Sequence, residues 1–336
     1  MQGSGMGSKG AGLKQGGRVL VRRVCGLGDL VLTIPWLMAL RGVHPGWSIH
    51  ALCSAQHAEF LKDMGIVHEA FPEEGSGWHH LFCASGGGPT CKLRPDPSWY
   101  DQIYLFLSDP KAPLVLALEK RVGKRVRVLP ARPSLSDPVH ASLVPFRAMG
   151  MEFQEDLVGL GSQRAERSQE CFLAHPGSGS RLKNWPPERF ASLMERISTA
   201  CPWAHWRVIQ GPADQEAVGQ LCGFWKGPVE ILRTSSLSWL ARQMEGSFLF
   251  VGNDSGLTHL AAFLGVPTLA IFGPSDPDRW APLGSRVQVA FRPEYCRPCH
   301  QAMEQPQCAQ PCQRFPSVPE AWERFLSLGL LPGSGP

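Results

Sequence analysis

FLFVGNDSGLTHLAAFLGVPTLAIF, at residues 248–272, is the stretch that decides the fold. Its apolar run at 248–252 predicts a buried strand, residues 256–264 predict a helix, and residues 268–272 predict the next strand. A helix that connects two such strands is typical of a parallel sheet, because parallel strands need a long crossover connection. The stretch therefore predicts an α/β domain.

The same alternation extends in both directions from this stretch. Further strands are predicted at residues 18–24, 48–53, 101–107, 125–129, 171–174, 206–210 and 229–232. Further helices are predicted at residues 30–41, 56–64, 187–198, 213–224 and 237–244. We predict two doubly wound, Rossmann-like halves that face each other across a cleft.

Chain length agrees with two domains, since 336 residues exceed the roughly 100–200 of one domain. We expect a flexible tail at 1–17, an N-terminal domain at 18–160 and a linker at 161–170, where the pattern lapses into the polar SQRAERSQE. A C-terminal domain follows at 171–316. The remaining residues, 317–336, predict a helix and tail that could pack back on the N-terminal domain.

Composition excludes several classes of protein. Hydrophobic residues make up 43% and charged residues 18%, which is typical of folded cores and not of disorder. The net charge of +4 is too small to indicate a nucleic-acid-binding protein. No run of 18 apolar residues predicts a membrane-spanning helix, and the Gly- and Ser-rich start is not a secretory signal. We therefore expect a cytoplasmic protein.

The first motif that could bind a ligand or take part in catalysis is RRVCGLGDL, at residues 22–30. A strand ends here, two glycines make a tight turn and a helix begins near Asp29. Ligands of parallel sheets bind beyond the carboxyl ends of the strands, so the Asp29 carboxylate is expected to face the cleft. An equally good alternative is that Asp29 only caps the helix. The full GxGxxG fingerprint is absent, which argues against a nicotinamide cofactor.

The second motif is HPGSGSRLKNWP at residues 175–186, a loop of small residues after a strand. Its glycines allow a close backbone approach, and the hydroxyls of Ser178 and Ser180 can bind phosphate oxygens. Lys183 adds a mobile positive charge. The alternative is a surface turn with a solvated lysine. The loop is not a Walker motif, because GxxxxGK[ST] is absent.

Two more strand ends complete the pattern. In VGNDSGLTHL, at residues 251–260, Ser255 and Gly256 open a helix whose free N–H groups form an anion site, and His259 lies one turn further on. The alternative is an ordinary capped helix with a core histidine. In GPADQE, at residues 211–216, Glu216 can accept hydrogen bonds from ribose hydroxyls. Together, the last three motifs predict a nucleoside diphosphate site at one edge of one sheet.

The segments GLGDLVLTIP, HPGSGSRLKNWPPERF, GPADQE and VGNDSGLTHLAAFLGVPTLAIFGPSDP resemble the heptosyltransferase family, glycosyltransferase family 9. The resemblance covers residues 18–330 and is vague between 66 and 165. It implies the GT-B fold and inverting transfer of heptose from ADP-heptose to the lipopolysaccharide inner core, with no cofactor required for catalysis. It also implies an N-terminal acceptor domain and a C-terminal domain for the nucleotide sugar.

The resemblance also implies roles for individual residues. Asp29 matches the family's proposed general base, and Lys183 matches the lysine that holds the donor phosphates. The other implied donor contacts are Asp254 to the sugar, Ser255 and Gly256 to the pyrophosphate through the backbone, His259 nearby, and Glu216 to the ribose.

The acceptor region departs most from the family pattern. Residues 73–99 are rich in Gly, Pro and Trp and predict a long loop, functional or mobile. A basic run follows, in which Arg121, Lys124 and Arg125 are candidates for binding an anionic acceptor. The alternative is a solvated charged face. The expected partners are a nucleotide-sugar donor and an anionic glycolipid at the inner face of the cytoplasmic membrane, to which the protein could attach peripherally.

Eleven cysteines without a secretory signal argue against a disulfide framework, because an odd number cannot all pair. Four of them cluster near the end: Cys296, Cys299, Cys308 and Cys312. Two close pairs could hold a structural Zn²⁺ or an iron–sulfur cluster. The alternative is a reduced, packed loop.

Other functions remain open from the residues alone. The same fold could use another nucleotide sugar or another surface-glycan acceptor. The chain could also bind a nucleotide sugar without turnover, although the presence of both Asp29 and Lys183 argues against this alternative.

Overall fold

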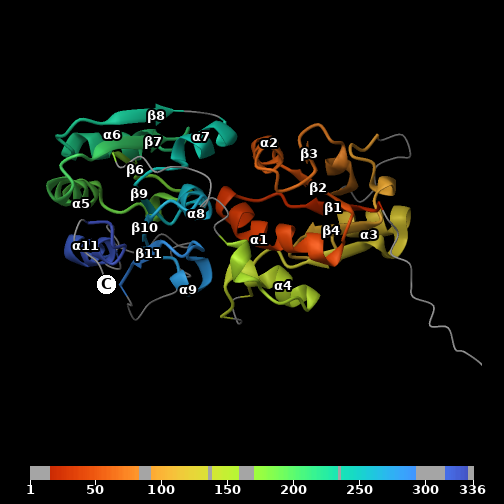
Figure 1. The fold of residues 1–336 in the computed structure, drawn as a ribbon. Helices are drawn as coiled ribbons and strands as arrows, with labels where there is room; N and C mark the ends of the chain where they lie inside the picture. Colours follow the sequence, from red (N-terminus) through yellow and green to blue (C-terminus); the bar gives the residue numbers. More distant parts are fainter. Residues whose placement is uncertain are drawn as a thin grey trace, which may run out of the picture.

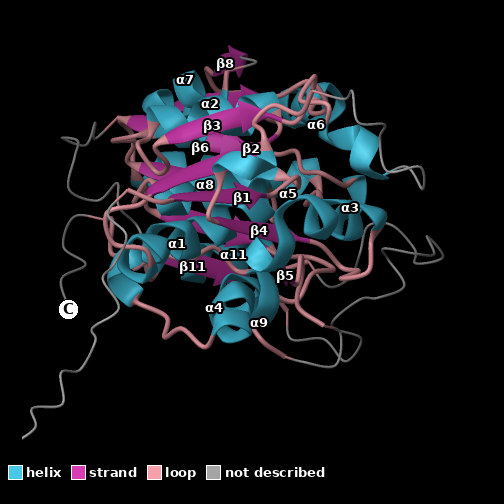
Figure 2. Cartoon of the chain, turned by 90° about the vertical axis from the view of Figure 1, so that its right-hand side faces the viewer, coloured by secondary structure: helices cyan, strands magenta, loops and turns pink. Residues whose placement is uncertain are grey.

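The computed structural model describes residues 16–82, 92–134, 138–158, 170–233, 236–292 and 315–331. These residues form two α/β domains, each built on a sheet with helices packed against it (Figures 1 and 2). The N-terminal sheet has the strand order β3-β2-β1-β4-β5 and the C-terminal sheet β11-β10-β9-β6-β7-β8. Neighbouring strands run parallel. The doubly wound prediction is confirmed.

The N-terminal domain comprises β1 (Arg18–Arg22), α1 (Leu27–Val43), β2 (Ser48–Cys53), α2 (Ala55–Asp63), β3 (Glu69–Pro72), β4 (Gln102–Phe106), α3 (Pro113–Val122), β5 (Val126–Leu129) and α4 (Val144–Met149). The C-terminal domain comprises β6 (Cys171–His175), α5 (Pro187–Ala200), β7 (His205–Gln210), α6 (Gln215–Phe224), β8 (Glu230–Arg233), α7 (Leu237–Met244), β9 (Leu249–Asn253), α8 (Gly256–Phe263), β10 (Thr268–Ile271), α9 (Pro277–Trp280), β11 (Val287–Ala290) and α11 (Val318–Leu326). Short 3₁₀ turns connect several of these elements.

Two edge strands were not apparent from the sequence. β3 (EAFP) and β11 (VQVA) each have four residues, most of them only partly buried. Their patterns are too short and too mixed to stand out, whereas the central β9 is buried at all of its positions. Helices cover both faces of the central strands in a parallel sheet, so nearly every side chain of such a strand is buried. The strand is therefore a continuous apolar run that can be recognised in the sequence.

The C-terminal helix corrects one expectation. α11 packs against α5 and β11 of its own domain, and Ala321 and Phe325 belong to the core of that domain. It does not pack back on the N-terminal domain, because its apolar face is already covered here (Figure 1). Most of the proposed linker, and the tail up to residue 15, lie outside the described residues.

The Gly-, Pro- and Trp-rich segment packs in part onto the N-terminal sheet. Trp78 is fully buried, and its Nε1 donates a hydrogen bond of 3.0 Å to the carbonyl of Pro95. Leu81 and Leu93 join the same core cluster. Residues 83–91, which include the glycine run, lie outside the described residues.

The helix α1 lies between the two domains. It packs on its own sheet and against α8 of the other domain, while α2 packs against α7 (Figure 1). Nine consecutive or nearly consecutive residues from Leu30 to Leu40 are buried, including Pro35 in the middle of the helix. A helix that is apolar all round is one that is covered all round. One hydrophobic cluster therefore runs continuously through both domains.

The order of the strands places the site. In the C-terminal sheet, β6 and β9 are neighbours, but the chain proceeds from β6 towards one edge and from β9 towards the other. Loops that diverge at such a switch point leave a crevice at the carboxyl ends of the two strands. β1 and β4 form the equivalent point in the N-terminal sheet. The motifs at Asp29, Lys183 and Asp254 all follow these strands.

Candidate functional site

The N-terminus of α8 is open. The helix follows β9 directly, with Ser255 at the N-cap position, and the Ser255 hydroxyl makes no capping hydrogen bond to the first turn. The four first N–H groups of a helix lack partners within the helix and carry the positive end of its dipole. The alternative of an ordinary side-chain cap is therefore wrong, and these N–H groups can bind an anion.

Lys183 and Asp254 meet at this helix end. Lys183, at the end of the short turn Arg181–Lys183, places Nζ 2.8 Å from Oδ2 of Asp254. The Asp254 side chain is 6% exposed and that of Lys183 is 27% exposed. Lys183 is therefore largely sheltered, and its charge lies beside the open helix end, where a phosphate could share it.

A buried polar network supports the two strand ends. His175 Nε2 lies 3.0 Å from Oδ2 of Asp214, and His175 Nδ1 lies 3.2 Å from Oγ of Ser255. Asn253, also buried, donates from Nδ2 to the carbonyl of Pro176 at 2.7 Å and accepts at Oδ1 from the N–H of Trp185 at 3.1 Å. These bonds hold the loop after β6 and the start of α8 in one fixed arrangement.

Asp29 faces the same region from the N-terminal domain. It is the third residue of α1, whose N-cap is Gly26, and among the described residues its carboxylate accepts no hydrogen bond from the backbone of this helix. The alternative that Asp29 only caps the helix is therefore wrong. Its Oδ2 lies 3.6 Å from a guanidinium nitrogen of Arg132, and its side chain is 16% exposed. The carboxylate is thus partly sheltered yet accessible.

The starts of α1 and α8 touch. A Cβ added to Gly256 would lie 2.6 Å from Leu27 Cβ and 3.0 Å from the backbone N of Gly28. One added to Gly28 would lie 3.1 Å from Cδ2 of His259. Two glycines thus let two helix N-termini converge, which concentrates positive potential where the lone acid Asp29 also lies.

Substitution of Gly256 by alanine tests this contact. The new methyl group would overlap Leu27, so the backbones of α1 and α8 must separate. We expect a loss of about 1–3 kcal/mol in the free energy of unfolding, as for other overpacked sites. Chemical denaturation measures it. Gly219→Ala, on α6 with nothing within 4 Å of the added Cβ, is the matched control. It should stabilise the protein slightly because alanine favours helix. Equal effects of the two substitutions would contradict the contact.

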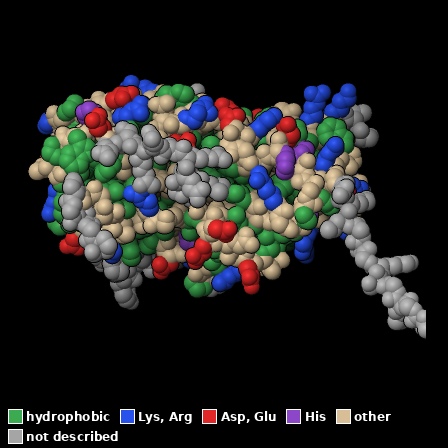
Figure 3. Space-filling view, viewed as in Figure 1, with side chains coloured by type: hydrophobic (Ala, Val, Ile, Leu, Met, Phe, Trp, Pro, Cys, Tyr) green, Lys and Arg blue, Asp and Glu red, His purple; other side chains and the backbone are tan. Residues whose placement is uncertain are grey.

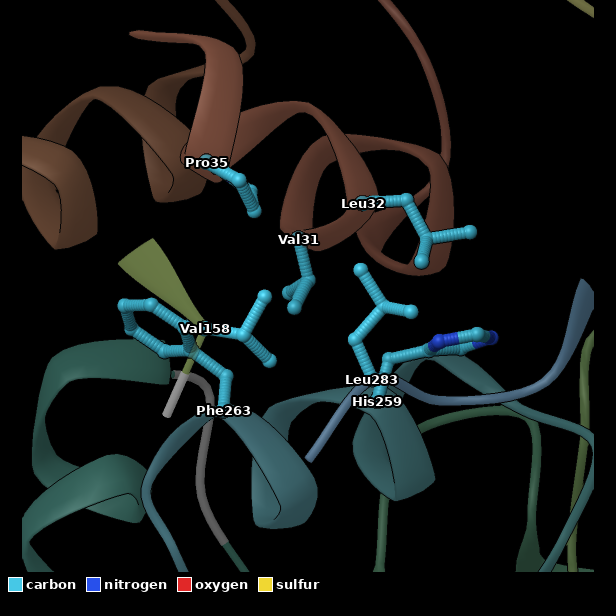
Figure 4. A pocket seen from close by; sticks show the side chains of 7 residues that line it. All are labelled: Val31, Leu32, Pro35, Val158, His259, Phe263 and Leu283. Atoms are coloured by element: carbon cyan, nitrogen blue, oxygen red, sulfur yellow. The ribbon is translucent and has the colours of Figure 1, made fainter. Parts of the chain in front are cut away.

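His259 is uncharged in this setting. Burial lowers its pKa to about 4; Asp254 and Asp29 raise it less, and Lys183 and His140 lower it further. Its Nδ1 has no hydrogen-bond partner within the part of the chain that the structure describes. Figure 4 shows its ring beside a small, mostly apolar hollow between α1 and α8. The hollow is lined by Val31, Leu32, Pro35, Val158, His259, Phe263 and Leu283.

Comparison with known proteins shows what this chain is similar to. Residues 147–310 match the family model described as glycosyltransferase family 9 (heptosyltransferase). This match spans just under half of the chain, which over that part is similar to the heptosyltransferase family. The lipopolysaccharide heptosyltransferase 1 of Pseudomonas aeruginosa is 34% identical over 123 residues, which are 35% of this chain and 32% of that protein. The heptosyltransferase 1 of Escherichia coli K12 is 31% identical over 117 residues, 33% of this chain and 34% of that protein. The chain thus matches about a third of the length of these curated relatives.

Solved structures extend the similarity of fold over nearly the whole chain. The ADP-heptose lps heptosyltransferase II of E. coli has a TM-score of 0.63 at 20% identity and covers 93% of this chain and 98% of that one. A glycosyltransferase family 9 structure from Veillonella parvula has a TM-score of 0.70 at 18% identity, with coverages of 93% and 97%. The fold of this chain is therefore GT-B.

Two other predicted donor contacts, Ser178 and Glu216, are engaged with protein groups, and Ser180 takes part through its carbonyl. The Ser178 hydroxyl lies 2.6 Å from the carbonyl of Ser180 and 2.7 Å from Oδ1 of Asn184, so it shapes its own loop. Glu216, in the first turn of α6, pairs with Arg181 at 2.5 Å. Both partners are largely exposed, so this pair contributes little and a ligand could replace it.

The predicted acceptor contacts are not at the site. Arg121, Lys124 and Arg125 lie at the end of α3 and in the turn before β5. A crossover helix returns to the amino-terminal edge of its sheet, so these cations lie at the edge opposite Asp29, on the side away from the C-terminal domain (Figure 1). Arg125 donates to the carbonyls of Val122 and Tyr100. The structure does not bring these three residues together with Asp29.

The predicted metal ligands Cys296, Cys299, Cys308 and Cys312 lie outside the described residues. Within the ranges that are described, no group of three or more His, Cys, Asp or Glu side chains could hold a metal ion. In the same ranges, no helix is long and apolar enough to cross a membrane. Figure 3 shows charges of both signs mixed over one face of the molecule.

Several residues that build this candidate site were not predicted from the sequence. Arg132 comes from the loop after β5 to the side of Asp29. His140 bridges the domains, since its Nε2 donates to the carbonyl of Ala281 at 3.0 Å, and burial lowers its pKa. His175 ends β6, and Asp214 lies in the turn between β7 and α6, after two strands that were predicted to be in one sheet. Their positions at strand ends were the available signal, but nothing local showed that the two side chains meet.

Proposed function

We propose that this chain is an inverting glycosyltransferase that transfers heptose from ADP-heptose to an anionic acceptor of the lipopolysaccharide inner core. One observation carries the proposal. Asp29 of one domain faces the open end of α8 and the Lys183–Asp254 pair of the other. An acid opposite an anion site is what a sugar transfer from a nucleoside diphosphate requires.

The reaction then uses these groups in a single displacement. The acceptor hydroxyl transfers its proton to the Asp29 carboxylate as its oxygen bonds to the anomeric carbon. The bond from that carbon to the diphosphate oxygen breaks, and its electron pair leaves with ADP. Attack opposite the leaving group inverts the anomeric centre.

The leaving diphosphate gains charge as this bond breaks. Lys183 and the first N–H groups of α8 lie ready to stabilise that charge, because both are fixed before the reaction begins. Preorganised donors of this kind are often the largest contribution to catalysis. Asp254, buried and paired with Lys183, is positioned to accept hydrogen bonds from the sugar of the donor. The Glu216 carboxylate could release its exposed partner Arg181 and accept hydrogen bonds from the ribose hydroxyls of the donor instead.

Arg132 is the cation that we assign to the acceptor. Its guanidinium is 66% exposed and lies 3.6 Å from Asp29, so it can reach an anionic group on the sugar whose hydroxyl Asp29 deprotonates. Guanidinium groups bind carboxylates and phosphates in a bidentate manner. We place the reaction at the inner face of the cytoplasmic membrane, where the glycolipid acceptor would be presented.

A panel of nucleotides tests the choice of donor. We expect ADP and ADP-sugars to raise the thermal unfolding temperature, and GDP and UDP compounds to raise it less, because binding to the native state stabilises it. Ligand at about a hundred times its Kd should add about 2.7 kcal/mol. Stabilisation by UDP-sugars alone would end the ADP-heptose proposal. No response to any nucleotide would favour a protein without this activity.

A further inference from the structure

Ser255 lies at the N-cap of α8 but does not cap it. Serine is among the preferred N-cap residues because its hydroxyl accepts from the second or third N–H of the helix. Here no such bond exists, although the backbone of Ser255 is in the extended conformation that N-caps adopt. Something else therefore holds the hydroxyl.

Two groups take the place of the cap. Ser255 Oγ lies 3.2 Å from His175 Nδ1 and 3.1 Å from Oγ1 of Thr258. Thr258 Oγ1 in turn donates to the carbonyl of Asn253. All of these atoms are buried, so the hydroxyl cannot exchange these partners for water.

His175 is itself held in place. Its Nε2 donates to Asp214 at 3.0 Å, and the same Asp214 oxygen accepts from the N–H of Gly211 at 2.9 Å. The backbone of the loop after β6 closes over this carboxylate: a Cβ on Gly177 would lie 1.9 Å from Oδ1 of Asp214. Burial raises the pKa of Asp214, but the hydrogen bond and charge of His175 and the Gly211 N–H lower it further, so the net shift is downwards. Asp214 is therefore a fixed carboxylate that sets the orientation of the ring.

We infer that His175, fixed by Asp214, is a positioning residue that keeps the Ser255 hydroxyl away from the first turn of α8. The N–H groups of Gly256 and Leu257, which have no hydrogen-bond acceptor among the described residues, are thereby kept for the diphosphate of the donor. This inference rests on the proposed function, because it names what prepares the same diphosphate site. It assigns to His175 and Asp214 an effect on donor binding without contact with the donor.

The alternative is that His175 and Asp214 merely support the fold. The two explanations differ in their dependence on the Ser255 hydroxyl. If His175 prevents capping, its loss matters only while there is a hydroxyl that can turn and cap. If it supports the fold, its loss matters equally with and without that hydroxyl.

A double-mutant cycle with His175→Gln and Ser255→Ala separates these explanations. Glutamine keeps a nitrogen near the Nε2 position, facing Asp214, and removes the group at Nδ1. The Kd for ADP, and in parallel for inorganic pyrophosphate, is measured by titration calorimetry. We expect His175→Gln to weaken binding about fivefold when Ser255 is present, the fold-change equivalent to one typical N-cap. In the Ser255→Ala background, the same substitution should weaken binding less than twofold.

Two further variants keep the test sharp. His175→Asn retains an amide group near the Nδ1 position, facing Ser255, but loses the bond to Asp214, so it should weaken ADP binding less than His175→Gln does. His50→Gln removes a half-buried histidine of the N-terminal sheet that bonds Tyr100 at 3.0 Å, and it controls for the loss of a packed imidazole. Thermal unfolding of every variant verifies the fold.

An unchanged Kd in His175→Gln, or an equal loss in both Ser255 backgrounds, would overturn the inference. If the wild-type chain bound pyrophosphate but not ADP, the ADP-heptose proposal would be refuted. The inference about His175 could still be tested, because the double-mutant cycle can be measured with the Kd for pyrophosphate. A wild-type chain that binds neither would end both.

Discussion

Replacement of Asp29 by asparagine is expected to lower kcat by about 10²–10⁴-fold, the usual contribution of a general base. The amide has nearly the same shape as the carboxylate but cannot accept the proton of the acceptor hydroxyl. Since Asp29 makes no capping bond, helix α1 should not depend on its charge for a cap. The change should therefore appear in turnover and not in folding.

Steady-state kinetics with ADP-heptose and a deacylated inner-core acceptor measures this effect. The matched control is Asp101→Asn, at the start of β4 on the opposite edge of the sheet, where the carboxylate accepts from the N–H of Arg18 at 3.0 Å. That variant should keep kcat within about twofold, as a change at the surface away from the site. A folded Asp29→Asn protein with the kcat of the wild type would refute the base assignment.

Replacement of Lys183 by alanine should have the second large effect. We expect kcat/KM for the donor to fall by about 10²–10³-fold, because a preorganised charge on the leaving group is removed. Stability should fall as well, since Asp254 stays buried without its partner. We estimate about 1–3 kcal/mol, less than for a fully buried pair because the lysine keeps some contact with water.

A second substitution separates the two consequences. Lys183→Ala combined with Asp254→Asn leaves no buried charge, so the free energy of unfolding should recover while kcat/KM stays low. Lys62→Ala breaks a pair of similar length, 2.9 Å to Glu69, in which both side chains are about half exposed. It should change stability by less than about 0.5 kcal/mol. Recovery of activity in the double variant would mean that Lys183 only balances the charge of Asp254.

The sequence was most informative where a buried strand runs directly into a helix. At β9 and α8 the apolar run, the small residues and the following helix are all local, and local patterns determine such units. At α1 the helix begins at Leu27, three residues before the expected start, although the glycines Gly26 and Gly28 do not favour a helix by themselves. The contact with α8 compensates for this weak propensity, and such a contact cannot be read locally.

The basic residues in the sequence did not locate the acceptor site, because a charge in the sequence does not show at which edge of the sheet its side chain lies. The basic residues around Arg121 form a conspicuous run, yet the path of α3 carries them to the wrong edge of the sheet. Arg132 is a single arginine in a loop and was not noticed, although it lies beside Asp29. The pair of His175 and Asp214 was missed for a related reason, because 39 residues separate two side chains that pack together.

The burial of α1 by both halves has a consequence for dividing this protein. Val31, Leu32 and Pro35 point at α8, so an N-terminal domain produced alone would expose this hydrophobic face of α1 to the solvent. Exposed hydrophobic surfaces of this kind bind other chains and cause aggregation. Neither domain should therefore be stable without the other. A chimaera that takes one domain from a relative must also keep a helix that matches α1 or α8 across the interface.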